Sequence, residues 1–280
     1  MTLNAPAKIN LNLLVGPPRS DGYHPIDSYV ARITLCDTVE LAARDDARVT
    51  IECLGADCGP GPSNLAYRAA AALAGLPGKK APGVDIRLTK RIPPGAGLGG
   101  GSSDAATVLM GLNRLWGLDL SPAALASVAA GLGSDVPLFL GPPAVRMTGR
   151  GEIVQPAEVF DFWSILCLPA LHVPTPAVYR QFDALPAVAL TQLDGAILAG
   201  PPSAWRGRLV NQLTPAAHAV CPALDAWRDQ LARLRLPVCL SGSGAAMFIL
   251  FDDETSARSA MESLGAPVRD VCQVVQLSPV

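Results

Sequence analysis

A glycine-rich segment, PPGAGLGGGSSDAA, occupies residues 93–106 of this 280-residue chain. Before it, Val84, Ile86 and Leu88 alternate with other residues, which is typical of a strand. After it, apolar residues recur at helical spacing as far as Trp116. Small residues between a strand and a helix let backbone N–H groups approach an anion, and the helix N-terminus adds favourable partial charge. The segment is therefore expected to hold a polyphosphate.

The glycine segment has three other interpretations. The pattern Gly95-x-Gly97-x-x-Gly100 matches a dinucleotide fingerprint, which would indicate a nicotinamide dehydrogenase. That fold needs a second strand ending in an acidic residue about 20 positions on, whereas Asp119 falls between two expected helices. A Walker phosphate loop needs a lysine after the last glycine, and none is there. The third alternative is a plain strand-to-helix connection that needs only turn glycines.

Two charged residues stand where they could act on a bound substrate. Lys8 lies on the polar face of an alternating segment, residues 7–15, with Asn10 on the same face. Asp135 follows Ser134 at the expected start of a helix. A carboxylate can accept the proton of a hydroxyl, and an ammonium can offset charge on a transferring group. The alternatives are a solvated lysine on an edge strand and an aspartate that only caps a helix.

Strands and helices that could position these residues alternate along the chain. In the first half, the expected strands are 7–15, 28–41 and 84–88, and the expected helices are 63–76, 105–116 and 121–133. In the second half, the expected strands are 162–168, 246–251 and 268–277, with one more before a turn at 241–245, and the expected helices are 176–184, 210–234 and 254–265. This mixture predicts an α/β (α+β) chain with two domains, 1–150 and 151–280. The weak, proline- and glycine-rich pattern at 143–160 marks their boundary.

Composition excludes several classes of protein. The net charge is −2 and only 16% of residues are charged, so there is no basic field for nucleic acid. The most apolar segments, VFDFWSILCLPAL and AAMFILF, are too short or too interrupted to span a bilayer as a helix. The first residues lack the cationic start and apolar run of a secretory signal. We expect a cytoplasmic protein, monomer or homodimer, with no nucleic acid and no membrane as partner.

The seven cysteines form no CxxC pair and lie near no histidine at ligand spacing. Reduced, mostly buried thiols fit this pattern best. Cys53 and Cys58 could in principle share a metal, but two ligands do not make a site.

The glycine segment resembles the ATP loop of the GHMP kinase superfamily, which includes galactokinase, homoserine kinase, mevalonate kinase and phosphomevalonate kinase. Other segments are similar to those of superfamily members whose acceptor is a cytidine-diphosphate-linked methylerythritol. These segments are PAKINLNLLV at 6–15, DGYHPIDS at 21–28, GSDVPLFL at 133–140, VPTPAVY at 173–179 and LSGSGAAMF at 240–248. The resemblance runs nearly end to end, and DGYH together with the glycine segment is more specific than either alone.

The resemblance implies a two-domain GHMP kinase fold, with an N-terminal ribosomal-S5-like domain and a C-terminal ferredoxin-like domain. It implies transfer of the γ-phosphoryl group of ATP to the 2-hydroxyl of the acceptor, in the non-mevalonate route to isoprenoid precursors. One alternative is another small-molecule kinase of the superfamily, with mevalonate, homoserine or a sugar as acceptor. Another is a non-catalytic RNA-binding relative of the S5-like fold, which the acidic balance disfavours.

The resemblance also implies roles for individual residues, with Lys8 and Asp135 as the catalytic pair. The expected ATP-binding residues are Asn64, Lys90, Pro93, Pro94, Gly95, Ala96, Gly97, Leu98, Gly99, Gly100, Gly101, Ser102 and Ser103. The expected substrate-binding residues are Asn10, Tyr23, His24, Thr175, Tyr179, Gly242, Ser243 and Gly244. A stacked aromatic ring and a histidine hydrogen bond suit a pyrimidine. Mg²⁺ is expected to accompany ATP, with Ser103 as a direct ligand and the rest of its shell from ATP and water.

Several of these residues have a structural alternative. Asn64 could cap the helix that follows it without contacting ATP, and the turn at 241–245 could be a plain hairpin turn. Tyr179 could serve only in packing, and His24 could be a surface turn residue. The chain also departs from the family pattern after Asn211, because NQLTPAA lacks the acidic pair that members often carry there. That difference argues against polar contacts from this helix.

Overall fold

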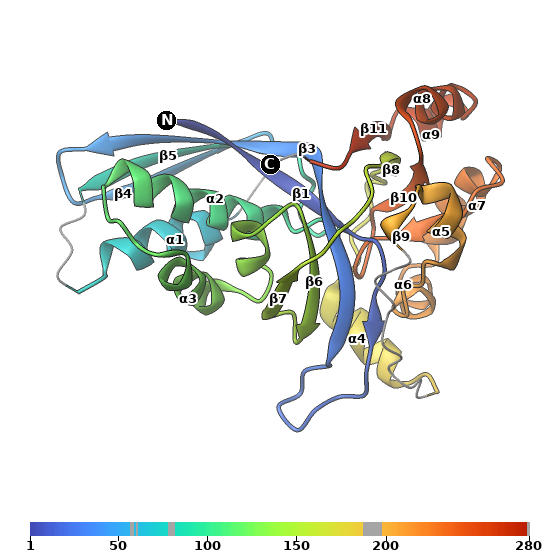
Figure 1. The fold of residues 1–280 in the computed structure, drawn as a ribbon, viewed down its shortest axis with the longest axis horizontal. Helices are drawn as coiled ribbons and strands as arrows, with labels where there is room; N and C mark the ends of the chain where they lie inside the picture. The colour runs from blue at the N-terminus through green and yellow to red at the C-terminus, as the bar shows by residue number, and fades with distance from the viewer. Residues whose placement is uncertain (57–58, 60, 78–81, 187–197, 279–280) are drawn as a thin grey trace. The chain divides into compact units, whose positions relative to one another are not determined.

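The computed structural model describes residues 1–56, 59, 61–77, 82–186 and 198–278, and its elements fall into two compact units (Figure 1). The first unit comprises Met1–Ala7, Leu35–Pro94 and Gly99–Pro142. The second unit comprises Lys8–Thr34, Gly95–Leu98 and Pro143–Val280. Each unit is thus assembled from separate segments, and the glycine segment contributes to both. The domain boundary at residue 150 stays a prediction.

The first unit is a sheet covered by helices. Its strands run in the order β4-β5-β3, with β5 antiparallel to β3 and parallel to β4, and β1 also pairs with β3. The strands are β4 (Val49–Leu54), β5 (Gly83–Thr89), residues 2–7 of β1 (Thr2–Asn10) and residues 35–44 of β3 (Ile26–Arg44), and the rest of β1 and β3 belongs to the second unit. Figure 1 shows the helices on one face of these strands, and they are α1 (Leu65–Ala74), α2 (Gly100–Leu115) and α3 (Pro122–Leu132). Leu41, Ile86, Leu109 and Leu112 are buried in this unit.

Side-chain caps begin two of these helices. The Oδ1 atom of Asn64 accepts a hydrogen bond from the Ala66 amide at 2.8 Å, at the start of α1. The Ser121 hydroxyl accepts one from the Ala124 amide at 3.2 Å, and Pro122 is the first residue of α3, as the sequence predicts. Each cap satisfies an amide that has no acceptor inside its helix, which contributes about 1 kcal/mol.

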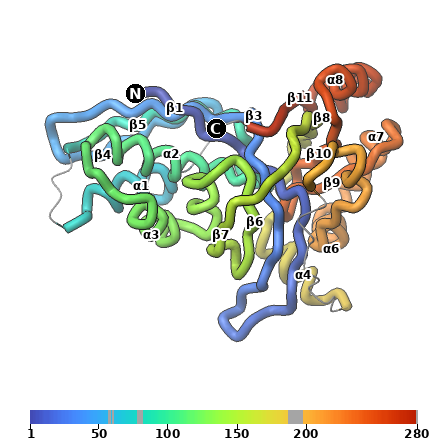
Figure 2. Tube along the Cα trace, viewed as in Figure 1, coloured from blue at the N-terminus to red at the C-terminus, as the bar shows by residue number. Residues whose placement is uncertain are grey.

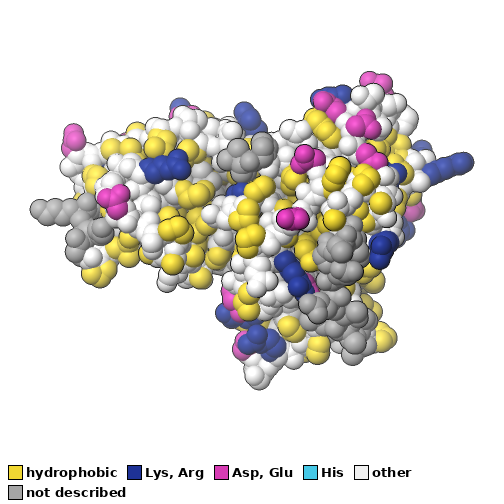
Figure 3. Space-filling view, viewed as in Figure 1, with side chains coloured by type: hydrophobic (Ala, Val, Ile, Leu, Met, Phe, Trp, Pro, Cys, Tyr) yellow, Lys and Arg dark blue, Asp and Glu magenta, His cyan; other side chains and the backbone are white. Residues whose placement is uncertain are grey.

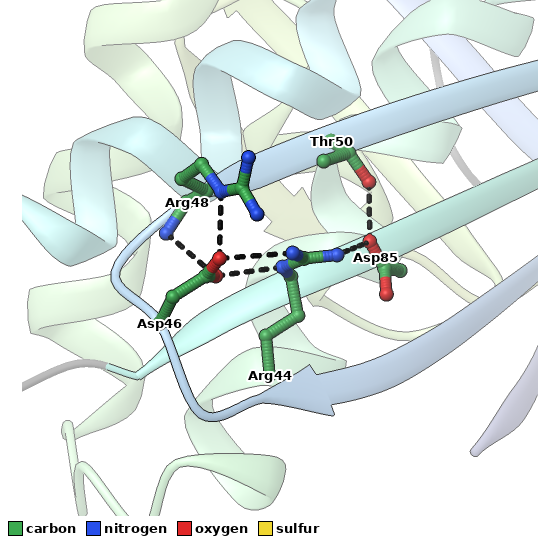
Figure 4. A network of polar contacts seen from close by, with 5 residues as sticks. All are labelled: Arg44, Asp46, Arg48, Thr50 and Asp85. Carbon is green, nitrogen blue, oxygen red and sulfur yellow. Dashed lines mark hydrogen bonds and ion pairs between the residues drawn. The ribbon is translucent and has the colours of Figure 1, made fainter.

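A polar network joins the β3–β4 turn to β5 (Figure 4). The Arg44 guanidinium donates to Asp46 at 2.7 and 2.9 Å and to Asp85 at 2.6 Å. Arg48 donates to Asp46 at 2.6 Å, and the Thr50 hydroxyl donates to Asp85 at 2.5 Å. Hydrogen bonds from Arg44 and Arg48 hold the pKa of Asp46 well below its usual value. The network fixes the turn with exposed ion pairs rather than with packing.

The second unit contains two groups of paired strands. In one group, β2 (Leu14–Val15) and β6 (Ala144–Gly149) pair antiparallel with β3, and β7 (Ile153–Pro156) pairs with β6. The other is an antiparallel sheet of order β11-β8-β10-β9. Its strands are β8 (Trp163–Cys167), β9 (Cys239–Leu240), β10 (Met247–Phe251) and β11 (Cys272–Gln276). The helices of this unit are α4 (Thr175–Asp183), α5 (Pro202–Trp205), α6 (Thr214–Val220), α7 (Ala223–Ala232), α8 (Glu254–Glu262) and α9 (Ala266–Arg269).

Alternate residues of β8 and β10 form the core of the second unit. Ile165 and Ile249 belong to one buried cluster with Val178 of α4, Leu231 of α7 and Ala257 of α8. Because successive residues of a strand point to opposite faces, this spacing directs every second side chain toward the helices. The expected strands at 162–168 and 246–251 are confirmed.

The elements differ from the sequence expectations in four places. The single helix expected at 210–234 is two helices, α6 and α7, because Pro222 has no amide hydrogen to continue the hydrogen-bond ladder. The weak pattern at 143–160 contains β6 and β7, and β4 was not expected at all. The first strand ends at Asn10, not at residue 15, and only residues 14–15 return to a strand.

Two further differences concern the residues singled out for chemistry. Helix α2 begins at Gly100, not at residue 105, so the last glycines and both serines form its first turn. Ser134 and Asp135 lie in a turn before a short 3-10 helix, Pro137–Leu140, instead of starting an α-helix. Pro137 fits this first position, where its missing amide hydrogen costs nothing.

Five of the cysteines, Cys36, Cys167, Cys221, Cys239 and Cys272, are free thiols, as expected. Cys53 is disulfide-bonded, which corrects the expectation that every thiol is reduced, and Cys58 lies outside the described residues. Within the described ranges, none of the helices has both the length and the apolar character needed to cross a membrane. On the face shown in Figure 3, Lys and Arg side chains lie among Asp and Glu side chains.

Candidate functional site

The second part of the glycine segment forms the start of α2 in the first unit. Gly99 is the N-cap, with a φ of 69°, a left-handed conformation that favours glycine. Having no side chain, Gly99 cannot cap the helix, and the first intrahelical bond runs from the Ser103 amide to the Gly99 carbonyl at 2.9 Å. The amides of residues 100–102 therefore have no acceptor inside the helix. They form a cradle suited to phosphate oxygens.

A buried charge cluster of Asp37, Lys90 and Asp104 lies directly beneath this first turn. The Lys90 ammonium lies 2.5 Å from Asp104 and also pairs with Asp37, and all three side chains are at most 4% exposed. Asp37 additionally accepts hydrogen bonds from the amides of Arg91 at 2.5 Å and Ile92 at 2.8 Å. The cluster thus ties β3, the chain after β5 and helix α2 together. Sequence reasoning found Lys90 but missed both aspartates.

Burial and charge act against each other within the cluster. Burial raises the pKa of the Asp104 carboxyl to about 7, because the charge of Lys90 only partly compensates for lost hydration. Burial lowers the pKa of the Lys90 ammonium, but the charges and hydrogen bonds of Asp104 and Asp37 outweigh it, and the net shift is upward. The charge of Asp104, and with it the ion pair between Asp104 and Lys90, therefore depends on pH near neutrality.

Two polar atoms on adjacent residues of α2 lack partners. Within the described part of the chain, Ser103 Oγ and Asp104 Oδ1 are buried and accept or donate no hydrogen bond. Ser103 is fully buried, so its hydroxyl is not exposed to solvent. Across the same described residues, no three His, Cys, Asp or Glu side chains are grouped to hold a metal. The described side chains therefore do not form a complete metal cage.

In the second unit, Lys8 belongs to a hydrogen-bonded cluster with Asn10, Ser28 and Ser241. The Lys8 ammonium donates to Asn10 Oδ1 at 2.5 Å, and Asn10 Nδ2 donates to the Ser28 hydroxyl at 2.9 Å. The Asn10 amide donates to the Ser241 hydroxyl at 3.3 Å. Lys8 is buried, not a solvated residue on an edge strand. The strand β1 thus delivers both polar side chains to one place, as their spacing predicts.

The first part of the glycine segment packs against the turn at 241–245. The Ser241 hydroxyl donates to the Gly97 carbonyl at 3.0 Å, and the Ala246 amide donates to the Ala96 carbonyl at 3.1 Å. Gly97 has a φ of 76°, and a Cβ atom there would collide with the Ser241 carbonyl oxygen. The two glycine-rich segments therefore form one structure, and the turn is more than a hairpin connection.

Asn211 is a residue of this region that sequence reasoning missed. Its Nδ2 atom donates to the carbonyls of Leu240 and Gly242, both at 2.8 Å, and so holds the turn from outside. The neighbouring Gln212 accepts a hydrogen bond from the Val15 amide at 2.6 Å. The segment that begins at Asn211 therefore makes polar contacts through the side-chain amides of Asn211 and Gln212. This corrects the expectation, drawn from the missing acidic pair, that the segment makes no such contacts. The amide pair NQ before a helix was the available signal.

His24, Tyr179 and Asp183 lie together in the second unit, and the two rings with this carboxylate are called the aromatic group below. His24 Nε2 lies 2.7 Å from Asp183 Oδ1, and the rings of His24 and Tyr179 are 5.0 Å apart. His24 lies in the loop before β3, which Figure 2 shows in blue, and the other two residues belong to α4. His24 is buried, so it is not a simple surface turn residue. Asp183 was missed, because an aspartate at a helix end gives no signal of this contact.

Other expected substrate residues lie nearby or point to solvent. The hydroxyls of Thr175 and Ser243 are 2.7 Å apart, which joins the start of α4 to the turn at 241–245. Tyr23 is 53% exposed, and the Arg150 guanidinium lies 4.8 Å from the centre of its ring. An exposed ring with a cation on one face is open to a second stacking partner.

The remaining expected residues lie in the first unit. Asp135 is half-buried in the turn after α3. Asn64 caps α1, and its Nδ2 atom also donates to the Cys53 sulfur at 3.7 Å, so its side chain serves the structure. The Lys90 side chain is held in the buried charge cluster. The functional roles of all these residues stay predictions.

Two family models match this chain. The family model described as "GHMP kinases N terminal domain" matches residues 64–141, and the model described as "GHMP kinases C terminal" matches residues 199–270. With the two-sheet α/β architecture and the glycine-started helix, these matches define the class: the chain belongs to the GHMP kinases.

Comparisons over the full chain narrow the class. The chain is 39% identical to a 4-diphosphocytidyl-2-C-methyl-D-erythritol kinase of Geobacter sp. (strain M21), over 93% of this chain and 92% of that protein. It is 41% identical to the kinase of the same name from Thiobacillus denitrificans, over 93% and 90%. It is 35% identical to the crystal structure of a 4-(cytidine 5'-diphospho)-2C-methyl-D-erythritol kinase, with a TM-score of 0.82 over 99% of this chain and 100% of that one. The chain belongs to this family of kinases.

A more distant comparison shows the fold alone. A homoserine kinase from Cytophaga hutchinsonii is 19% identical, with a TM-score of 0.72 over 100% of this chain and 94% of that one. The expected two-domain GHMP kinase fold is confirmed. The dehydrogenase alternative is wrong, because α2 is followed by α3 and not by the second parallel strand of a dinucleotide fold.

Proposed function

We propose that this protein transfers the γ-phosphoryl group of ATP to the 2-hydroxyl of 4-diphosphocytidyl-2-C-methyl-D-erythritol, giving the 2-phosphate and ADP. The observation that carries the proposal is the 39–41% identity to kinases of that name over at least nine tenths of each chain. The reaction would be a step in the non-mevalonate formation of isoprenoid precursors.

The proposed ATP site uses the glycine segment, residues 93–103. The amides at the start of α2 would donate to phosphate oxygens, and the helix N-terminus adds favourable charge. The uncapped start of α2 supports this part of the proposal, because its amides have no competing acceptor inside the helix. Asn64 and Lys90 remain proposed for the adenine side of the site.

Lys8 and Asp135 are the proposed catalytic residues. Asp135 would accept the proton of the acceptor hydroxyl, and Lys8 would offset negative charge that develops on the transferring group. Because phosphoryl transfer passes through a loose transition state, positioning and charge neutralisation outweigh proton abstraction. We therefore expect the loss of Lys8 to cost as much activity as the loss of Asp135.

The cytidine is proposed to bind at the aromatic group of His24 and Tyr179, with Tyr23 and Thr175 as further contacts. Asp183 supports this proposal, because its bond to Nε2 fixes which ring nitrogen of a neutral His24 carries the proton. Nδ1 is then an acceptor, which fits the amino group of cytosine. Asn10 and the turn residues Gly242, Ser243 and Gly244 are proposed to contact the rest of the acceptor.

Mg²⁺ is proposed as the companion of ATP, and it would neutralise charge on the β- and γ-phosphate oxygens. The described side chains do not form a metal cage, so ATP oxygens and water would supply most of the ligands. Ser103 stays a predicted ligand. We also propose a cytoplasmic location, a monomeric or homodimeric state and a domain boundary near residue 150, which lies between the two ranges matched by the family models.

The test is ADP release with a panel of acceptors. The panel contains 4-diphosphocytidyl-2-C-methyl-D-erythritol, mevalonate, homoserine and galactose, each with ATP and Mg²⁺. We expect turnover with the first acceptor only. No turnover with it and clear turnover with another acceptor would assign the chain to a different GHMP kinase reaction.

A further inference from the structure

Two thiols face each other across strands β8 and β11 of the second unit. Cys167, the last residue of β8, is paired with Cys272, the first residue of β11, in antiparallel register. Both are free thiols. Among the described strands, β11 lies at the edge of its sheet, so no described strand of that sheet flanks Cys272 on its outer side.

The hydrogen-bond pattern shows which kind of pair this is. The next pair along the ladder, Leu168 and Val271, is joined by an amide-to-carbonyl bond of 2.8 Å. At the other end, Leu277 donates to Phe162 at 3.1 Å. Bonded and non-bonded pairs alternate in an antiparallel ladder, so Cys167 and Cys272 form a non-hydrogen-bonded pair.

The Cα atoms of a non-hydrogen-bonded pair lie closer together than those of a hydrogen-bonded pair. Cα atoms of a non-hydrogen-bonded pair lie about 4.5 Å apart, within the range of about 4.4 to 6.8 Å that disulfides span. The side chains of a directly opposed pair also point to the same face of the sheet. Cys167 belongs to the core cluster and Cys272 packs against it, which agrees with a shared face.

The two thiols differ in exposure and in acidity. Cys167 is fully buried, whereas Cys272 is half-buried and can be reached by a small reagent. A hydrogen bond from Cys167 lowers the pKa of the Cys272 thiol against the effect of burial. The same bond and burial raise the pKa of Cys167. Because Cys272 is the more exposed of the two thiols, it is the one that a peroxide reaches first, and Cys167 is the thiol beside it.

We propose that Cys272 and Cys167 form an oxidisable dithiol site that a hydroperoxide converts to an intramolecular disulfide. The Cys272 thiolate attacks one peroxide oxygen and breaks the O–O bond, which gives a sulfenic acid and, for hydrogen peroxide, water after protonation. The Cys167 sulfur then attacks the Cys272 sulfur, its proton leaves with the hydroxyl as a second water, and the S–S bond forms. The two thiols lose two electrons in total, and the peroxide gains them.

Cys239 is the matched control in the same sheet. It lies on β9 opposite Phe248, so it faces no second thiol. Burial alone raises the pKa of Cys239 to about 12. A thiol of this kind is expected to react slowly with peroxide and to form no disulfide within the sheet.

The experiment is peptide mapping after oxidation of the whole protein. The reduced protein is treated with hydrogen peroxide, remaining thiols are blocked with N-ethylmaleimide, and the protein is digested with trypsin without reduction. Cys167 is the only cysteine of the tryptic peptide 151–180, and Cys272 is the only one of 270–280. We expect these two peptides to appear linked, with a mass two hydrogens below their sum, and to separate on reduction.

Two variants test the order of the steps. Cys167→Ser should leave a sulfenic acid on Cys272 that dimedone traps, because no thiol remains to resolve it. Cys239→Ser should form the linked peptides as well as the unmodified protein does. The proposal is overturned if both peptides are recovered with blocked thiols, if Cys272 is found linked to another cysteine, or if it is oxidised without forming a bond to Cys167.

Discussion

The two parts of the glycine segment are held by different chemistry. In the first unit, the start of α2 rests on the buried charge cluster of Asp37, Lys90 and Asp104. In the second unit, Gly97 is held by the Ser241 hydroxyl and the backbone of the 241–245 turn. One half of the loop is fixed by desolvated charges, and the other is fixed by uncharged hydrogen bonds and close packing.

This difference has an energetic consequence. A buried ion pair contributes little net stability over apolar residues, but removal of one partner leaves an uncompensated charge that costs about 3 to 5 kcal/mol. Removal of one neutral hydrogen bond costs about 1 kcal/mol. We therefore expect one substitution in the charge cluster to cost more stability than one substitution among the neutral hydrogen bonds that hold Gly97.

The largest effect is expected on activity, from one residue in each unit. Lys8→Ala and Asp135→Asn should each lower kcat by about 10² to 10⁴-fold, the range attributed to a positioned acid or base. Steady-state ADP release measures kcat, and far-UV circular dichroism checks that the variants are folded. Near-normal turnover in either folded variant would contradict the role proposed for that residue.

Breaking the buried charge cluster should produce the largest loss of stability. Lys90→Met leaves two buried carboxylates without their cation and should lower the free energy of unfolding by about 3 to 5 kcal/mol. Urea unfolding measures the change. Arg258→Ala is the matched control, because it removes an exposed i,i+4 pair with Glu254 and should cost about 0.5 kcal/mol or less. Equal losses in the two variants would show that burial does not distinguish these ion pairs.

The cluster should also give stability a dependence on pH. The pKa of Asp104 is about 7 in the folded protein, above the value of about 3.9 in an unfolded chain. The folded state therefore holds this proton more tightly, and the contribution of Asp104, complete below about pH 4, is lost as pH rises through about 7. The slope for this group is at most about 1.4 kcal/mol per pH unit.

Asp104→Asn removes this titration. Urea unfolding of the unmodified protein and of the variant, measured at several pH values between about 4 and about 7, should give a flatter profile for the variant. A profile with the same slope in both proteins would show that Asp104 does not bind its proton more tightly in the folded state.

The smallest effect is expected in the second unit. Ser241→Ala removes the hydroxyl that donates to Gly97 and accepts from the Asn10 amide, and should cost about 1 to 2 kcal/mol. Urea unfolding again measures the loss. A cost as large as that of Lys90→Met would remove the distinction between the charged and the uncharged support of the glycine segment.

Local signals explain which parts of the fold could be predicted. Ser121 and Pro122 mark the start of α3, alternation marks β5, and a short apolar run marks β10, because these signals act between near neighbours. The break between α6 and α7 was missed although Pro222 signals it. Strand β4 was missed although Val49, Ile51 and Cys53 alternate with Thr50 and Glu52, which is the pattern of a half-buried strand.

The sequence by itself determined the family, the position of the glycine segment between a strand and a helix, and the common face of Lys8 and Asn10. These follow from residue types and short spacings, which local geometry converts directly into position. Only the tertiary structure decided that Asp37 and Asp104 neutralise Lys90, that Asn211 holds the second glycine turn and that Cys167 opposes Cys272. Those partners are 14 to 105 residues apart in sequence, and which ones meet depends on strand register and helix packing, which no local pattern specifies.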